Sequence, residues 1–313
     1  MRDPNIQIGP IAIGQAIRAI CGLLSAIFFL LIVMGSSSSD ALASEIDHGV
    51  LSQFEVPAER VISLAPHLTE LMFHIGAGES LVGVMASSDF PPAALLLPRV
   101  GSHRLLDLEK IISLRPDLVL GWEQGNHEAD LSMIRRLGFN VFESNPGTLE
   151  EIAALIRQLG LLMDKAQIAE SQARDFERKI AELRRRYAKK KPVRVFYQVW
   201  DHPIYTLNGT HVVSQLIEDC GGVNVFSELP TISVVVSVEA VLNADPDMIV
   251  GGLTETEDAS PVSRWSQWPA MTAVASQNLI SINADHIARM GPRIVLAMTE
   301  LCEKMDLART RLQ

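Results

Sequence analysis

The 313-residue sequence predicts an α/β protein with two Rossmann-like lobes, each built on a parallel-rich sheet, joined by one long α-helix. Three observations lead to this prediction. Predicted strands alternate with predicted helices in both halves of the chain, which favours parallel sheets. One helix-to-strand unit occurs in each half, as DLEKIISLRPDLVLG (107–121) and as SVEAVLNADPDMIVGG (237–252). Between the two halves, a long helical segment that follows Asp164 contains neither Gly nor Pro.

The first 43 residues are expected to be a secretion signal and not part of the fold. Their apolar run, residues 19–34, has 16 residues, whereas a membrane-spanning helix needs roughly 20. Two arginines precede the run, and Ala41 and Ala43 form a small-x-small cleavage pattern after it. We therefore expect cleavage after Ala43. An uncleaved membrane anchor is the alternative.

The first lobe is expected over residues 44–163. Gly and Pro bound its apolar runs, and they mark the ends of helices and the positions of loops. The paired prolines of SSDFPPAA, for example, exclude a helix or a central strand at that point. The expected elements are strand 61–64, helix 66–76, strand 81–84, helix 107–115, strand 117–121, and a helix and a strand on either side of Gly138.

A connecting helix is expected over residues 164–190. The helical pattern itself runs over residues 148–188, with one weak point at Gly160. At about 1.5 Å per residue, the part after Asp164 would span about 35–40 Å, a length that suits a rigid strut between two lobes. Its basic run RRRYAKKK (184–191) is explained by a solvated helix C-terminus, where cations interact favourably with the helix dipole.

The second lobe is expected over residues 191–313 and repeats the order of the first. A strand again leads into a loop and a helix, and the second copy of the helix-to-strand unit follows. The expected elements are strand 193–199, loop 200–210, helix 210–222, strand 223–226, the unit at 237–252, and a last helix and strand within 268–282.

Composition and motifs exclude several classes of function. A formal net charge of −10 argues against nucleic acid as a partner, because phosphate binding needs basic surfaces. The sequence contains no G-x-S-x-G elbow, no H-E-x-x-H motif and no phosphate-binding glycine loop, so we expect a protein that is not an enzyme. His67 and His74 share a helix face, but without a third ligand they predict no metal site.

Two cysteines remain once the predicted signal is removed. Cys220 and Cys302 form an even pair in a chain expected to be exported to an oxidising compartment, which predicts a disulfide bond. Two separate buried thiols are the alternative that the sequence leaves open.

The order and spacing of several segments resemble the substrate-binding proteins of bacterial importers for cobalamin, haem and ferric siderophores, the class hinged by a single helix. The segments are RVISLAPHLTEL, LRPDLVLGW, CGGVNVF, PDMIVGG and RMGPRIVLA, and SSDFPPAA and GWEQGN look most like the cobalamin-binding members. The two mature cysteines also stand where those members carry a disulfide.

The resemblance implies a monomeric periplasmic protein without a resident cofactor. It would capture cobalamin, or a related corrinoid, in a cleft between the lobes and deliver it to an ABC permease dimer in the inner membrane. Haem or a ferric siderophore is the alternative ligand on the same scaffold. A receptor subunit that reports a ligand to a membrane sensor is a further alternative.

Candidate ligand-binding residues follow the predicted strands, because ligands of parallel α/β lobes bind outside the carboxyl ends of strands. Aromatic side chains there offer flat apolar surfaces to a broad macrocycle, and polar groups could meet its amides or carboxylates. The resemblance matches Phe90, Trp122 and Tyr205 to aromatic contacts of cobalamin-binding members. For all the aromatic candidates, packing within a lobe is the alternative. The candidates are Phe90, Trp122, Trp200, Tyr205, Asp285, His286 and Arg289.

The sequence departs from the cobalamin-binding pattern at three positions. His103, Ser233 and His286 stand where some members carry Trp. His103 is a further candidate for ligand binding, because an imidazole can coordinate cobalt or haem iron. A hydrogen bond in the cleft and an incidental loop position are its alternatives.

Glu109 and Glu239 occupy the same position in the two copies of the repeated unit. Stabilisation of the first helical turn by the helix dipole explains such a Glu without any function. The resemblance implies another role, since an equivalent Glu on each lobe of these proteins contacts arginines of the two permease subunits.

Overall fold

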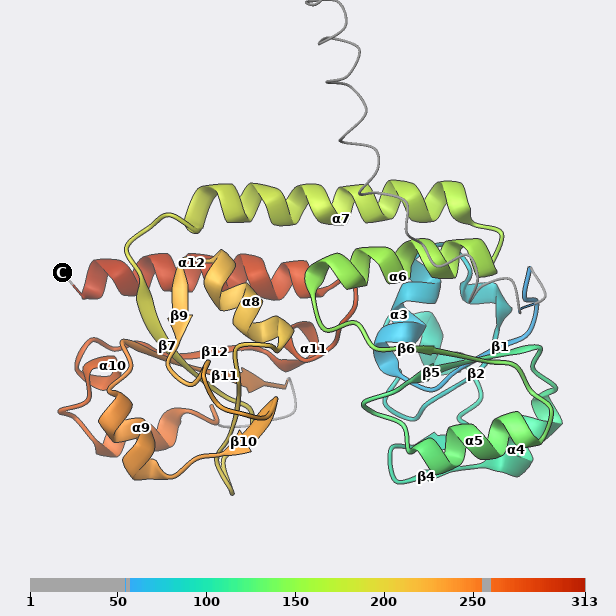
Figure 1. Ribbon diagram of the computed structural model, residues 1–313, viewed down its shortest axis with the longest axis horizontal. Coiled ribbons are helices and arrows are strands. Elements are labelled where there is room, and N and C mark those ends of the chain that lie inside the picture. The colour runs from blue at the N-terminus through green and yellow to red at the C-terminus, as the bar shows by residue number, and fades with distance from the viewer. Residues whose placement is uncertain (1–53, 55–56, 255–259, 313) are drawn as a thin grey trace, which may run out of the picture. The chain divides into compact units, whose positions relative to one another are not determined.

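The computed structural model describes residue 54, residues 57–254 and residues 260–312 (Figure 1). The predicted secretion signal and its cleavage after Ala43 lie outside these described residues. Residues 51–313 form one compact unit. Within that unit, two four-stranded parallel sheets carry helices on their faces and form two lobes, so the predicted α/β class with two lobes is confirmed.

The N-terminal sheet has the strand order β2-β1-β5-β6, with parallel pairing throughout. Its central strands are buried, and the helix α3 begins at a proline, which tolerates the first turn because that turn has unpaired N–H groups anyway. The elements are β1 (Val61–Ser63), α3 (Pro66–His74), η1 (Gly78–Ser80), β2 (Leu81–Val84), η2 (Pro92–Leu96), β3 (Gly101–Ser102), β4 (Leu105–Leu106), α4 (Leu108–Leu114), β5 (Leu118–Trp122), α5 (Glu128–Arg136), β6 (Val141–Ser144) and α6 (Leu149–Leu162).

The C-terminal sheet has the order β12-β11-β7-β9 and is also parallel. Trp265 and Phe196 are fully buried at its core, with their ring centroids 5.8 Å apart. The elements are β7 (Val193–Gln198), β8 (Tyr205–Leu207), α8 (Val212–Asp219), β9 (Gly222–Asn224), β10 (Ser233–Val235), α9 (Val238–Ala244), β11 (Met248–Leu253), η3 (Ser263–Gln267), α10 (Thr272–Ala275), β12 (Leu279–Asn283), α11 (Ala284–Ile287) and α12 (Ile294–Arg311).

The repeated unit forms the same helix and strand in both lobes. The side chain of Asp107 accepts a hydrogen bond from the backbone N–H of Lys110 at the start of α4. Ser237 accepts the corresponding bond from Ala240 at the start of α9. Each oxygen satisfies an N–H group that has no partner within the helix, which explains why the two helices begin where they do.

The Pro-Asp pair of each copy fastens the unit to the first strand of its sheet. Asp117 accepts hydrogen bonds from the backbone N–H of Arg60, and Asp247 accepts one from that of Arg194. The two arginines in turn donate to carbonyl groups at the ends of α4 and α9. Each lobe therefore ties the N-terminal ends of its two central strands together with the same hydrogen bonds.

The long connecting helix is α7 (Ala166–Tyr187), which lies along both α6 and α12 (Figure 1). Its 22 residues correspond to about 33 Å. The predicted weak point at Gly160 is wrong: the chain breaks at Asp164, whose φ is 51°, and Gly160 lies inside α6. A Cβ atom at Gly160 would lie 2.2 Å from the Cβ of Ala169, so the glycine permits close packing of α6 on α7.

A disulfide bond joins Cys220, at the end of α8, to Cys302 in α12. The predicted pairing is confirmed, and the alternative of two separate thiols is wrong. Both cysteines are fully buried, so the bond ties two helices of the C-terminal lobe together beneath its surface.

Candidate functional site

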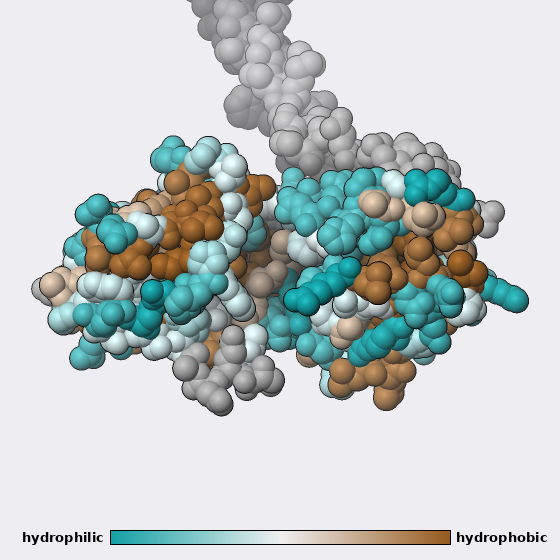
Figure 2. Space-filling model, turned by 90° about the horizontal axis from the view of Figure 1, so that it is seen from below, coloured by the Kyte–Doolittle hydropathy of each residue, from teal (hydrophilic) through white to brown (hydrophobic). Residues whose placement is uncertain are grey.

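A groove separates the two lobes on the face seen in Figure 2. Several predicted site residues stand at the C-terminal end of a strand or shortly after it. Trp122 is the last residue of β5, so the strand begins and ends one residue later than predicted. Asp285 and His286 follow β12 in the one-turn helix α11.

Trp122 packs against residues of its own lobe and keeps one polar atom without a partner. Its ring lies 5.2 Å from that of His67 in an edge-to-face arrangement, and the backbone of Gly125 lies directly against it. Asn126 fixes the turn by accepting from the Trp122 backbone N–H and donating to the carbonyl of Leu64. The buried indole Nε1 has no hydrogen-bond partner among the described residues. Such a donor costs about 1–3 kcal/mol unless a bound molecule supplies an acceptor.

His67 is the second buried polar group at this position. Its Nε2 atom also has no hydrogen-bond partner within the described part of the chain. Burial, assisted by the positive charge of Arg289, lowers the pKa of His67 to about 3. The imidazole is therefore neutral at pH 7.

Trp200 and Tyr205 lie together in a tight hairpin of the C-terminal lobe. The backbone N–H of Tyr205 donates to the carbonyl of Trp200, and that of Val199 donates to the carbonyl of Tyr205. Trp200 is 60% exposed, which excludes the alternative that it packs within the lobe. Its indole N–H donates to the carbonyl of His202, and the ring is thus held on the surface.

Phe90 lies apart from the other predicted aromatic residues. Its ring is 41% exposed and lies 4.1 Å from the guanidinium carbon of Arg293. It lines a cavity of about 670 Å³ beneath α7, which none of the other predicted ligand-binding residues lines. His103 is exposed in the turn between β3 and β4.

A cluster of ion pairs joins the two lobes next to Phe90. Two of its members, Asp285 and Arg289, are among the predicted site residues. Arg289 contacts Asp285 of its own lobe, and Glu70 and Asp89 of the other. Arg293 donates two hydrogen bonds to Glu70, whose side chain is 1% exposed.

The electrostatics of the cluster favour its charged form. Burial opposes the charge of Arg289, but hydrogen bonds to Asp89 and Glu70 outweigh it and raise the pKa of the guanidinium. The hydrogen bond from Arg289 lowers the pKa of Asp89. Burial, followed by the charge of Arg293, lowers the pKa of His286.

Glu70, Asp89 and Arg293 are the residues that sequence reasoning missed. One signal was present for Glu70, because it is a lone carboxylate among the buried residues of α3 and therefore needs a partner. Nothing in the sequence indicated that the partner lies 223 residues further along.

No group of three His, Cys, Asp or Glu side chains among the described residues is arranged to hold a metal ion. Within the same residues, no helix combines the length and apolar character needed to cross a membrane.

Comparison with known proteins places most of the two-lobe region in one family. The model of the periplasmic binding protein family matches residues 61–286. A vitamin B12-binding protein of Vibrio cholerae is 38% identical over 253 residues, which cover 80% of this chain and 91% of that protein.

Solved structures agree with the family match. The periplasmic vitamin B12-binding protein BtuF of Vibrio cholerae has a TM-score of 0.75 and 37% identity, covering 81% of this chain and 98% of BtuF. The periplasmic haem-binding protein RhuT from Roseiflexus has a TM-score of 0.70 and 27% identity, covering 82% of this chain and all of RhuT. The chain therefore belongs to the periplasmic binding protein family.

Proposed function

We propose that the protein captures cobalamin, or a related corrinoid, in the groove between its lobes and delivers it to an ABC permease dimer in the inner membrane. The observation that carries the proposal is the 38% identity with a vitamin B12-binding protein across both lobes. The work of such a protein is binding and not catalysis, and the corrinoid is its cargo and not a cofactor. It acts in the periplasm as a monomer, after cleavage of a secretion signal at residues 1–43.

Aromatic rings supply the main contacts in this proposal. Trp122, Trp200 and Tyr205 offer flat apolar faces to a macrocycle, and Trp200, at 60% exposure, is the most accessible of them. The unpartnered N–H of Trp122 suits an acceptor on the ligand, such as an amide carbonyl. Phe90, which contacts Arg293, and the exposed His103 are the remaining candidates for ligand contact in this proposal. Asp285, His286 and Arg289 contribute polar groups, with Arg289 already held by three carboxylates.

Titration of the purified protein with cyanocobalamin, followed by calorimetry and by the absorbance of the corrin ring, tests the proposal. We expect Trp200→Ala to weaken binding about tenfold, because a contact ring is lost, and Trp200→Phe to restore most of the affinity. Absence of binding at micromolar protein would contradict the proposal.

Haem is the second candidate ligand, and a ferric siderophore belongs to the same alternative. The structural likeness to the haem-binding protein RhuT favours haem, and the exposed imidazole of His103 is a suitable iron ligand. Titration with haemin separates the two: tight haemin binding that is lost in His103→Ala, without cyanocobalamin binding, would favour haem.

Delivery requires a docking surface, and we place it on the two copies of the repeated unit. Glu109 and Glu239 are both exposed in the first turns of α4 and α9. Four residues before each Glu lies an exposed apolar side chain, Leu105 at 75% and Val235 at 51% exposure. Each lobe therefore presents one carboxylate and one apolar contact, an arrangement that suits a partner with two equivalent subunits.

A further inference from the structure

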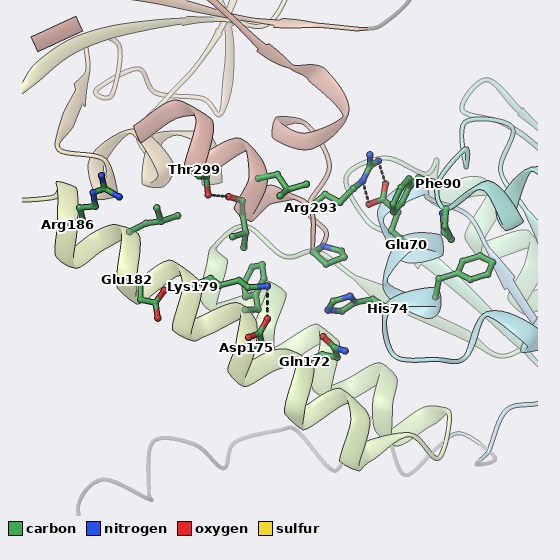
Figure 3. A pocket seen from close by; sticks show the side chains of 17 residues that line it. Glu70, His74, Phe90, Gln172, Asp175, Lys179, Glu182, Arg186, Arg293 and Thr299 are labelled. Carbon is green, nitrogen blue, oxygen red and sulfur yellow. Dashed lines mark hydrogen bonds and ion pairs between the residues drawn. The ribbon is translucent and has the colours of Figure 1, made fainter. Parts of the chain in front are cut away.

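We infer that the cavity beneath α7 is a second ligand site, separate from the groove, which takes an amphipathic anion with one apolar chain and one carboxylate, such as a medium-chain fatty acid. The cavity lies between α3, α7 and α12 and has a volume of about 670 Å³ (Figure 3). This volume is within the range of roughly 300–1,000 Å³ found for small-molecule sites.

The walls of the cavity are mainly apolar. Phe176 and Leu183 come from α7, Val295 and Leu296 from α12, and Phe73 from α3. Leu296 is 52% exposed although it lines a concave surface, so an apolar ligand would remove it from water. Burial lowers the pKa of His74, and its ring is thus a neutral part of the same wall at pH 7.

The shape of the cavity suits a chain and not a compact molecule. Along α7 its lining residues recur every three or four positions, from Gln172 to Arg186, which places them on one face of the helix. Phe176 and Arg186 are separated by ten residues, or about 15 Å of helix. An acyl chain can follow this face with its carboxylate at one end.

The charges at the cavity identify the sign of the ligand. Its three carboxylates already have cationic partners: Glu70 pairs with Arg293, Asp175 with Lys179, and Glu182 with Arg178, which lies outside the cavity. Arg186, at the far end of the α7 face, has no carboxylate partner among the described residues and contacts the ring of Tyr187. The guanidinium is therefore available to an anionic head group.

The ion pair between Glu70 and Arg293 forms the border between this cavity and the residues proposed for the corrinoid. Both side chains line the cavity, and Glu70 also contacts Arg289. The two sites thus share a wall but no aromatic residue other than Phe90. A molecule in the cavity would touch α3 of one lobe, α12 of the other and the helix that joins them.

Calorimetric titration with dodecanoate below its micellar concentration tests the inference on the purified protein. We expect a dissociation constant on the order of 10 μM and much weaker binding of dodecylammonium, which has the same chain and the opposite charge. Arg186→Gln should weaken dodecanoate binding about tenfold, because a charge-assisted hydrogen bond is lost. Leu296→Glu should abolish binding by placing a carboxylate in the apolar wall.

Arg185→Gln is the matched control, since it removes the same charge from the neighbouring residue of α7, which does not line the cavity. It should keep the affinity within about twofold of the unmodified protein, which is below the effect of one charged hydrogen bond. Circular dichroism spectra of all variants should coincide. The inference would be overturned if the two arginine substitutions had equal effects on dodecanoate binding. Equal affinities for dodecanoate and dodecylammonium, or unchanged dodecanoate binding by Leu296→Glu, would also overturn it.

Discussion

Glu70 of α3 accepts hydrogen bonds of 2.8 and 2.6 Å from Arg293, which lies at the start of α12 in the other lobe. The same carboxylate accepts a third bond, of 3.0 Å, from Arg289. One buried side chain of the N-terminal lobe therefore holds two arginines of the C-terminal lobe.

Replacement of Glu70 by Gln should destabilise the protein strongly. The substitution keeps the size of the side chain but leaves two partly buried arginines without their shared counter-charge, and removing one partner of a buried pair costs about 3–5 kcal/mol. Urea unfolding should show a decrease near the lower end of this range, since Arg289 keeps Asp89 and Asp285. Glu79→Gln, at an exposed position of η1, is the control and should change little. Equal stabilities of the two variants would contradict the argument.

Acid should destabilise the protein through His67. Burial lowers its pKa from 6.5 to about 3. Between these pH values, the imidazole therefore binds a proton in the unfolded chain but not in the folded chain. The free energy of unfolding is unaffected by this group above pH 6.5, and it decreases by about 1.4 kcal/mol per pH unit as the pH falls from 6.5 toward 3. His211, whose pKa burial lowers to about 4, acts in the same direction.

The check is the pH dependence of the free energy of unfolding and not its absolute value. Between pH 7 and pH 5, His67→Gln should lose about 2 kcal/mol less stability than the unmodified protein. His103→Gln should lose as much as the unmodified protein, because it retains His67. Parallel pH profiles for all three proteins would show that His67 is not responsible.

Reduction of the disulfide should lower stability. The bond between Cys220 and Cys302 has a sequence separation of 82, for which the chain-entropy model gives about 4–5 kcal/mol. Urea unfolding with and without dithiothreitol measures the loss. A double variant with Ala at both positions should be insensitive to dithiothreitol, and any remaining sensitivity in that variant would assign the effect to another cause.

Charge reversal at Glu109 and Glu239 should impair delivery without affecting corrinoid binding. Glu109→Lys combined with Glu239→Lys should reduce ligand-stimulated ATP hydrolysis by the reconstituted permease at least about tenfold, since like charges would then face each other across the interface. Each single variant should have a smaller effect, and lower salt should strengthen docking of the unmodified protein. Glu79→Lys controls for net charge. Full stimulation by the double variant would exclude this docking surface.

Much of the fold could be predicted because its signals are local. The strands and helices follow from apolar periodicity and from Gly and Pro, and the repeated unit carries its caps and its Asp residues within a few positions. The place of Gly160 inside α6 could not be predicted, because a glycine lowers helix propensity, whereas this one is required there by the close approach of Ala169 in the next helix. Packing between α6 and α7, and not helix propensity, explains the glycine at position 160.

The candidate site was predictable only in part, for the same reason. The positions of Trp200 and Tyr205 followed from the rule that loops after strands carry binding residues, and the hairpin does bring them together. The position of Phe90 did not follow, because it depends on Arg293 in the other lobe. Likewise, Arg289 was expected as a polar contact for the ligand, and the sequence did not show that three carboxylates hold it.

The ion pairs between Glu70 and the two arginines before α12 also affect the protein without its ligand. A wide separation of the lobes would require Glu70 to release both guanidinium groups and to break the ion pairs that join the lobes. These ion pairs therefore oppose a wide separation of the lobes, and we expect their spacing to change little when the ligand binds. We therefore expect recognition by the transporter to depend on what the ligand changes at the rim of the groove, and not on a large rotation of either lobe.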